Sequence, residues 1–135
     1  MGLHQNLLDD PIAEIELRQL ITLPADATIA DAVSQMQTHR LGCVAVLKDD
    51  GTPEGVFTER RLLALLSNRG GAVVNEPIGD HLNREWICVK RTEPVAHLLD
   101  LMCEQELRFV GVLDEDGRAV GLTGQKGLIE YIADH

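Results

Sequence analysis

The residues of this chain that could perform chemistry are not spaced for catalysis or for metal binding. Its three cysteines, Cys43, Cys88 and Cys103, lie far apart, and no two of them have the spacing of metal ligands. No serine lies in a nucleophile-elbow pattern, and no Walker-type glycine loop precedes a Lys-Ser or Lys-Thr pair. The histidines also lack ligand spacing: His4, His39, His81, His97 and His135. We therefore predict no catalytic residue, no metal ligand and no enzymatic activity.

The cysteines are better explained as packing residues. Cys43 and Cys88 lie in apolar stretches that resemble strands, and Cys103 belongs to a helical pattern. A cysteine in such a setting behaves as a small hydrophobic residue, and free thiols are typical of a reducing compartment. We expect all three to be buried.

The composition is that of a globular domain, and its acidic charge argues against nucleic-acid binding. Of the 135 residues, 44% are hydrophobic and 25% are charged, and the formal net charge is −10. Binding to DNA or RNA depends largely on Lys and Arg that neutralise phosphates, so the acidic balance argues against it. The sequence has no apolar run of about 18 residues, and residues 1–10 lack the basic start and apolar stretch of a signal peptide. These features predict a cytoplasmic protein without a membrane or nucleic-acid partner.

The chain also contains an internal duplication. Residues 10–68, moved forward by 66 positions, align without a gap on residues 76–134. The identical pairs include Pro11 with Pro77, Arg18 with Arg84, Met36 with Met102, Val46 with Val112, and Gly55 with Gly121. A unit of roughly 60 residues is marginal as a lone domain, so we expect the two copies to share one core. Two such copies should pack about a pseudo-two-fold axis, with clefts where they meet.

Each copy is predicted to fold as strand, helix, strand, strand, helix. In the first copy, a strand at 20–23 precedes a helix that starts at a capping box of Thr28 and Asp31 and ends near Arg40. A continuous apolar strand at 43–47 follows, and an Asp-Gly turn leads to an antiparallel strand at 54–58. The last element is a helix at 60–67.

The second copy repeats this order, with strands at 86–90, 109–113 and 119–123. Its helices are predicted after Pro94, with Met102 on the apolar face, and at 126–133. The predicted organisation is an extension at 1–9, either loose or docked on a partner, a first repeat at 10–68, a flexible linker at 69–75 and a second repeat at 76–135.

This order of elements resembles the cystathionine-β-synthase (CBS) domain. The resemblance rests on Thr22-Leu23-Pro24 before the capped helix, the strand that ends at Leu47, the Asp-Gly turn and Gly55-Val56-Phe57-Thr58, and it recurs in the second copy. It implies an α/β (α+β) fold made of two β-α-β-β-α repeats packed as one CBS pair. It also implies a regulatory module, often a homodimer, that binds adenine nucleotides between its repeats.

The resemblance places one ligand-binding cleft around the end of the first copy's third strand. Nucleotide-binding members carry a Thr or Ser followed three residues later by an Asp that holds the ribose, and here Thr58 is followed by Arg61. Arginine has no acceptor for ribose hydroxyls. The predicted residues of this first cleft are Val56, Thr58, Arg61, Ile87, Leu107 and Arg108. Two guanidinium groups would suit a phosphate or carboxylate. Alternatively, Arg61 pairs with Glu59 and fills the cleft.

A second cleft is implied on the opposite side, with weaker features. Gly124 and Gly127 stand at both polar positions of the motif, so no side chain there specifies a nucleoside. Phe109 either stacks on a base or belongs to the core. The predicted residues of this second cleft are Ile21, Leu41, Gly42, Phe109, Leu122, Gly124 and Gly127.

Two functions are compatible with these residues. The first is a stand-alone module that senses a small anion, foremost AMP, ADP, ATP or a related adenosyl compound, needs no cofactor, and acts in trans on an effector protein. The second is a structural or oligomerisation module that has lost its ligand. Apolar helix positions beyond the needs of a thin sheet favour a homodimer in either case: Leu62, Leu65, Leu66, Leu98, Leu128 and Ile132.

Overall fold

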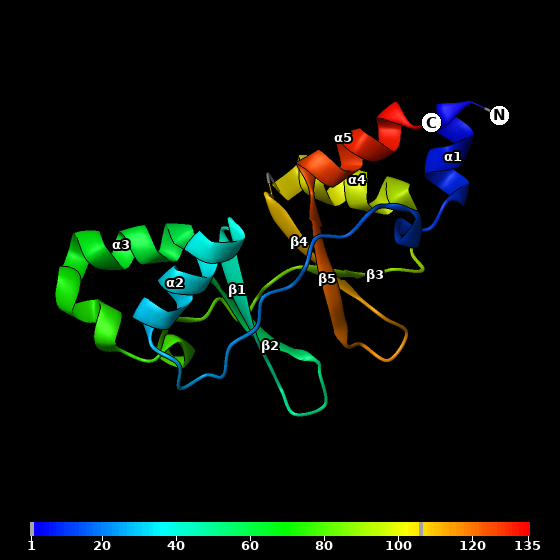
Figure 1. Cartoon of the computed structure of the whole chain (residues 1–135). Coiled ribbons are helices and arrows are strands. Elements are labelled where there is room, and N and C mark those ends of the chain that lie inside the picture. The colour runs from blue at the N-terminus through cyan, green and yellow to red at the C-terminus, as the bar shows by residue number, and fades with distance from the viewer. Residues whose placement is uncertain (1, 106) are drawn as a thin grey trace. The chain divides into compact units, whose positions relative to one another are not determined.

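Residues 2–105 and 107–135 are described by the computed structural model, and they form two α+β units (Figure 1). One unit is the continuous segment Leu20–Trp86. The other combines both ends of the chain, Met1–Gln19 and Ile87–His135. We call them the middle unit and the terminal unit. The boundaries of the units therefore fall inside the two sequence repeats, whose first residues join the opposite unit.

The middle unit consists of a two-stranded sheet packed against helices. Its elements are α2 (Ile29–His39), β1 (Cys43–Leu47), β2 (Pro53–Thr58), α3 (Glu59–Arg69) and the 3-10 helices η2 (Gly71–Asn75) and η3 (Ile78–His81). β1 and β2 are antiparallel, with Val44 opposite Phe57 and a register shift after Val46. Side chains from both strands and every helix form one core, in which Phe57 and Ile29 are fully buried.

The predicted capping box at the start of α2 is confirmed. The Thr28 hydroxyl accepts from the Asp31 backbone N–H at 3.1 Å, and the Asp31 carboxylate accepts from the Thr28 N–H at 3.0 Å. These bonds satisfy backbone donors that have no partner within the helix. The helix ends at Arg40, which adopts a left-handed conformation.

Two segments of the middle unit differ from the sequence-based expectation. The strand expected at 20–23 is reduced to a parallel bridge between Thr22 and Ala45, with hydrogen bonds from both sides of that bridge. The linker expected at 69–75 is not a flexible joint, because it contains η2, and its Val73 is 1% exposed in the core. The segment is short and contains glycine, but burial of the Val73 side chain is enough to pack it against α2 and α3.

The terminal unit has a three-stranded sheet. Its elements are α1 (Leu3–Asp9), η1 (Ile12–Glu14), β3 (Cys88–Lys90), α4 (Val95–Gln105), β4 (Phe109–Leu113), β5 (Ala119–Gly124) and α5 (Gln125–Ala133). β4 lies in the centre, parallel to β3 and antiparallel to β5. The β4–β5 pair has a register shift after Val112, the position equivalent to Val46 in the middle unit. The same irregularity in both hairpins reflects the duplication.

The N-terminal residues are integral to the terminal unit. Ile12 and Ile15 belong to its core, and the backbone of Arg18 pairs with Leu122 of β5. The Tyr131 hydroxyl of α5 donates to Asp10 Oδ2 at 2.5 Å, and the two chain ends lie near each other in Figure 1. The extension 1–9 was expected to be loose or docked on a partner, but its residues Leu3–Asp9 form α1, which contacts α4. The apolar side chain of Leu7 explains this, since it packs against the core.

The expectation of three buried cysteines holds only in part. Cys43 is 1% exposed, whereas Cys88 is partly buried and Cys103 is exposed on α4. Burial raises the pKa of the Cys88 thiol to about 11, so this thiol stays protonated at neutral pH. The prediction for Cys103 was wrong because a helical pattern does not distinguish a position at the margin of the apolar face from one at its centre.

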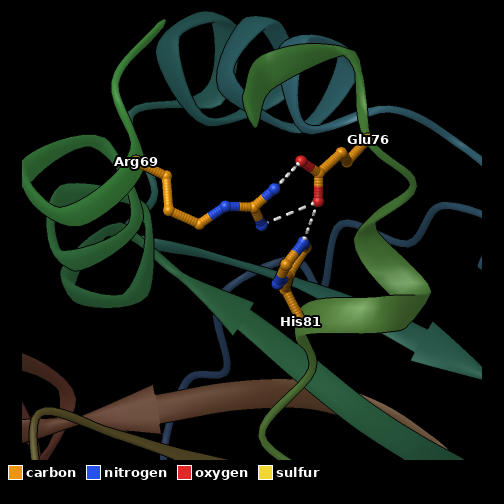
Figure 2. A network of polar contacts seen from close by, with 3 residues as sticks. All are labelled: Arg69, Glu76 and His81. Atoms are coloured by element: carbon orange, nitrogen blue, oxygen red, sulfur yellow. Dashed lines mark hydrogen bonds and ion pairs between the residues drawn. The ribbon is translucent and has the colours of Figure 1, made fainter. Parts of the chain in front are cut away.

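A charged network joins α3 to the segment that follows it (Figure 2). Both nitrogens at the end of the Arg69 guanidinium donate to the Glu76 carboxylate, one of them at 2.9 Å. His81 Nε2 lies 2.9 Å from Glu76 Oε1, and the His81 side chain is 9% exposed. The hydrogen bonds from Arg69 first, and then that to His81, hold the pKa of Glu76 below its ordinary value of 4.5.

This lowered pKa predicts an acid-sensitive contribution to stability. A carboxyl group whose pKa is lower in the folded state stabilises the fold above its unfolded pKa, and this contribution is lost as the pH falls through the folded pKa. Glu76→Gln should therefore lose less unfolding free energy than the wild type between about pH 6 and about pH 3. Urea titrations across this range measure the effect. Arg69→Gln should flatten the profile in the same direction, and a Glu76→Gln profile parallel to the wild type would contradict the assignment.

Candidate ligand-binding site

A pocket of about 260 Å³ lies in the terminal unit, where β5 leads into α5. It is lined by Arg18, Arg108, Phe109, Thr123, Gly124, Gln125, Lys126 and Gly127. All of these residues belong to one unit, and they come from three parts of the chain: the N-terminal segment, the start of β4 and the β5–α5 junction.

The N-terminus of α5 opens onto this pocket without a side-chain cap. Gly124 is the N-cap residue and makes no side-chain hydrogen bond, and no acidic residue lies in the first turn. In α3, by contrast, the Thr58 hydroxyl accepts from the Arg61 N–H at 3.1 Å, and Glu59 stands in the first turn. Uncapped backbone N–H groups and the positive end of the helix dipole favour an anion.

Three cationic side chains reinforce this preference. Arg18, Arg108 and Lys126 line the pocket together, and no carboxylate is among the lining residues. Two guanidinium groups and an ammonium carry about 13 N–H donors between them and no acceptor. The net charge of the chain is −10, so this cluster of three cations is locally opposite in sign to the protein as a whole.

Thr123 contributes a buried hydroxyl. The residue is 2% exposed, and its Oγ1 has no hydrogen-bond partner among the residues that the structure describes. Leaving a buried hydroxyl unpaired costs about 1–3 kcal/mol, so Thr123 lowers the stability of the terminal unit.

Two glycines shape the same wall by close approach. A Cβ at position 124 would lie 2.4 Å from the carbonyl oxygen of Arg108, and a Cβ at position 127 would lie 2.9 Å from Thr123 Oγ1. Both distances are well below van der Waals contact. The glycines at the polar positions of the motif are therefore required by packing, which the sequence alone could not show.

Three of the residues predicted for the second cleft line this pocket: Phe109, Gly124 and Gly127. Leu122 is fully buried on β5 one residue before Thr123. The other three predicted residues, Ile21, Leu41 and Gly42, belong to the middle unit, where all three are buried.

The residues predicted for the first cleft are divided in the same way. Arg108 lines the pocket just described, and Ile87 and Leu107 lie elsewhere in the terminal unit. Val56, Thr58 and Arg61 lie in the middle unit, where the Thr58 hydroxyl caps α3 and Arg61 is exposed. Both predicted clefts combine residues of the two units and stay predictions.

Sequence reasoning missed four of the lining residues: Arg18, Thr123, Gln125 and Lys126. The duplication pairs Arg18 with Arg84, but the equivalent backbone bridge in the middle unit joins Val56 to Asn83. The pairing is thus shifted by one residue between the copies, and such a shift turns a side chain to the other face. Lys126 could have been found, because its position in the first turn of the predicted helix indicates a cation at the N-terminus.

The fold and this pocket define a class: paired β-α-β-β-α repeats with a polar pocket where the last strand of a repeat meets its helix. The family pattern described as CBS domain matches residues 12–68 and 78–134. The chain belongs to the CBS domain family, and the fold predicted from the resemblance is confirmed.

Related proteins are similar to this chain over most of its length at low identity. A 17.7 kDa protein of Acidianus ambivalens is 23% identical over 91% of this chain and 73% of its own length. A CBS domain protein of Pyrobaculum aerophilum, solved in complex with AMP, matches with a TM-score of 0.78 and 23% identity, covering 93% of this chain and 99% of that one. A CBS domain pair solved with 5′-methylthioadenosine and S-adenosyl-L-methionine gives 0.78 and 19%, covering 92% and 96%. The chain spans 61% and 22% of two other curated relatives.

The described residues contain neither a membrane-spanning helix nor a cluster of metal ligands. None of the helices in this part of the chain is both long and apolar enough to cross a membrane. Within the same residues, no group of three or more His, Cys, Asp and Glu side chains is placed to hold a metal ion.

Proposed function

We propose that this chain is a regulatory CBS pair that senses a small anionic ligand, foremost an adenine nucleotide, and acts on an effector protein in trans. The observation that carries the proposal is the pocket at the N-terminus of α5, lined by Arg18, Arg108 and Lys126. The Pyrobaculum relative, solved with AMP, supports the adenine nucleotide. A homodimer in the cytoplasm, where such nucleotides are abundant, completes the proposal.

The signal requires a difference in affinity between two conformations. A ligand shifts a protein only as far as it binds one state better than another. We propose that the N-terminal segment supplies this difference, because its Arg18 lines the pocket together with the β5–α5 junction. A bound anion that neutralises the three cations would draw Arg18 toward the β5–α5 junction. Ligand binding would in this way change the position of the N-terminal segment.

A thermal-shift screen tests the proposal. Wild-type protein is heated with AMP, ADP, ATP, S-adenosylmethionine and inorganic phosphate, each at concentrations far above micromolar. A ligand that binds only the folded state raises stability by RT ln(1 + [L]/Kd), about 2.7 kcal/mol at a hundredfold excess over Kd. We expect a clear rise in Tm with at least one nucleotide, and its loss in Arg108→Ala.

Arg61→Ala is the companion variant. It removes a cation of the middle unit that does not line the pocket, so the shift should survive in this variant. Loss of the shift in Arg61→Ala alone would move the site to the predicted first cleft. An unchanged Tm with every compound would remove the sensing function.

The second candidate is an oligomerisation module. Leu63 of α3 and Ile129 of α5 are each 65% exposed, which favours contact with another surface. Light scattering coupled to size-exclusion chromatography should then show a dimer at micromolar concentration that nucleotides do not affect. A nucleotide-dependent change in mass would favour the sensor instead.

A further inference from the structure

We propose that Asp10 and His135 form a pH-sensitive clasp, which holds the end of α5 on the N-terminal segment below about pH 6 and loosens above about pH 8. Both residues belong to the terminal unit, and neither lines the pocket described above. The proposal therefore goes beyond ligand sensing and does not depend on it.

The duplication places an acid and a base at the same two positions in both units. With the offset of 66 residues, Asp10 corresponds to Glu76 and His135 corresponds to Arg69. The middle unit has the Arg69–Glu76 contact of Figure 2, whereas in the terminal unit His135 Nε2 lies 3.7 Å from Asp10 Oδ2. Arginine stays charged throughout the neutral range, but histidine changes its charge between about pH 5 and pH 8. Of these two pairs, the terminal one can therefore respond to pH in this range.

The orientation of the His135 ring makes its contact with Asp10 depend on protonation. Nδ1 lies 2.8 Å from the backbone carbonyl oxygen of Tyr131, which can only accept, so Nδ1 carries the proton of the neutral ring. Nε2 is then an acceptor that faces another acceptor, Asp10 Oδ2. A second proton turns Nε2 into a donor and gives the ring a charge that the carboxylate attracts. Stacking on Tyr131, with 4.2 Å between the ring centroids, holds the ring in this orientation.

Asp10 connects the clasp to three helices. Its Oδ2 accepts from the Tyr131 hydroxyl of α5 at 2.5 Å, and its backbone carbonyl accepts at 3.0 Å from the N–H of Val95, the first residue of α4. Asp10 is also the C-cap residue of α1. The Asp10 and His135 side chains are 29% and 31% exposed, so water and salt screen their interaction less than that of a fully exposed pair. The clasp therefore affects how firmly α1, α4 and α5 are held together.

The groups nearest the His135 ring are negative or neutral. Tyr131 stays neutral between pH 6 and pH 8, because burial first and then the hydrogen bond to Asp10 raise the pKa of Tyr131 to about 12. Glu14 of η1 is close enough to Tyr131 to contribute to this rise through its negative charge. Asp134, the neighbour of His135 in the chain, is exposed. These negative charges attract a proton to the ring.

The charged side chains on α1 and at the start of α4 pair with other residues. Asp9 of α1 accepts a hydrogen bond from Gln5 at 2.7 Å. At the start of α4, His97 Nε2 lies 3.4 Å from Glu93 Oε2. His97 is thus a second histidine of the terminal unit with a carboxylate partner, and the test must separate its titration from that of the clasp.

Thermal unfolding of the full chain without ligand, at pH 6 and at pH 8, tests the clasp. A proton that the folded chain binds more tightly than the unfolded chain stabilises the fold where it is bound, so the contribution of His135 is present at pH 6 and lost by pH 8. His135→Gln should therefore lower Tm by about 2–4 °C at pH 6 and by less than about 1 °C at pH 8. His97 is present in both proteins, so its titration cancels in the difference.

Further variants identify the partner and copy the permanent pair of the middle unit. In an Asp10→Asn background, His135→Gln should have the same effect on Tm at both pH values, because the carboxylate is gone. His135→Arg places the residue type of Arg69 at this position, so it should match the wild type at pH 6 and exceed its Tm by about 2–4 °C at pH 8. His39→Gln is the matched control: His39 is exposed in the last turn of α2, and its loss measures the effect of a histidine at a helix end.

Three results would overturn the proposal. The first is an equal change in Tm for His135→Gln at pH 6 and pH 8. The second is a pH-dependent loss in His39→Gln as large as that in His135→Gln, which would assign the effect to helix ends in general. The third is a His135→Arg variant whose Tm depends on pH as the wild type does, and this variant decides the matter if Asp10→Asn does not fold. All samples are free of ligand, so none of these results bears on the proposed sensing function.

Discussion

Phe57→Ala should lower the free energy of unfolding by about 3–5 kcal/mol. Phe57 is the largest of the fully buried side chains, and it lies on β2 opposite Val44. It packs in the core of the middle unit with residues from α2, α3 and η2. Truncation removes the transfer free energy of the ring and leaves a cavity that the surrounding elements fill only in part. Urea denaturation followed by far-UV circular dichroism measures the loss.

Leu63→Ala is the control for this substitution. Leu63 lies on α3 in the same unit but is 65% exposed, so its truncation should change stability by no more than about 0.5 kcal/mol. A loss below about 1 kcal/mol for Phe57→Ala would show that the ring is not the centre of that core.

Gly124→Ala should destabilise the terminal unit by about 1–3 kcal/mol and abolish the response to ligand. The added Cβ would lie 2.4 Å from the carbonyl oxygen of Arg108, a backbone atom that cannot rotate away. Relief of this overlap requires β4 and β5 to separate at the Phe109–Gly124 pair, the position where the pocket is built. The variant should therefore lose both stability and ligand binding.

Gly71→Ala provides the matched control. A Cβ at position 71 would meet nothing within 4 Å, so this variant should retain both its stability, within about 0.5 kcal/mol, and its ligand response. Thermal unfolding of the two glycine variants with and without AMP makes the comparison. If Gly124→Ala matched Gly71→Ala in both readouts, the account of the β5–α5 junction would be wrong.

The long periodic elements were predictable from the sequence. The capping box of Thr28 and Asp31 fixed the start of α2, and the apolar run from Cys43 to Leu47 is β1. These signals are local, because each depends on residues within a few positions. The strand expected at 20–23 is only a bridge to Ala45, and the extent of this pairing was not predictable because Ala45 is remote in the sequence.

The association of the units with the chain ends was not predictable. Nothing within residues 10–19 shows that Ile12 and Ile15 are buried with the second repeat instead of the first. A repeat alignment pairs equivalent residues, but it does not say which copy each segment packs against.

Several apolar helix residues that were predicted to form a surface for self-association are buried in the structure. Leu65, Leu98 and Leu128 were counted toward a surface for self-association, yet each is at most 6% exposed within the core of its own unit. Of the predicted set, Ile132 is exposed at 36%, and Leu63 and Ile129, which lie outside that set, are each 65% exposed. The homodimer therefore stays a prediction, and these three residues are the exposed apolar positions that support it.

The pocket itself depended on packing that no short motif encodes. The glycines at positions 124 and 127 indicate the loss of a nucleotide motif when taken from the sequence. In the structure they permit close approach to Arg108 and Thr123, and they leave the first turn of α5 uncapped. These two glycines therefore do not by themselves indicate the loss of a binding site.

The most direct test of the account is an NMR titration of the full chain with AMP and with pyrophosphate, followed through its backbone amides. The account predicts saturable shifts that begin at Gly124, Gln125 and Lys126 and extend to Arg108, with no comparable change at Thr58 and Arg61. The absence of saturable shifts, or shifts confined to the start of α3, would contradict a ligand-sensing site at the N-terminus of α5.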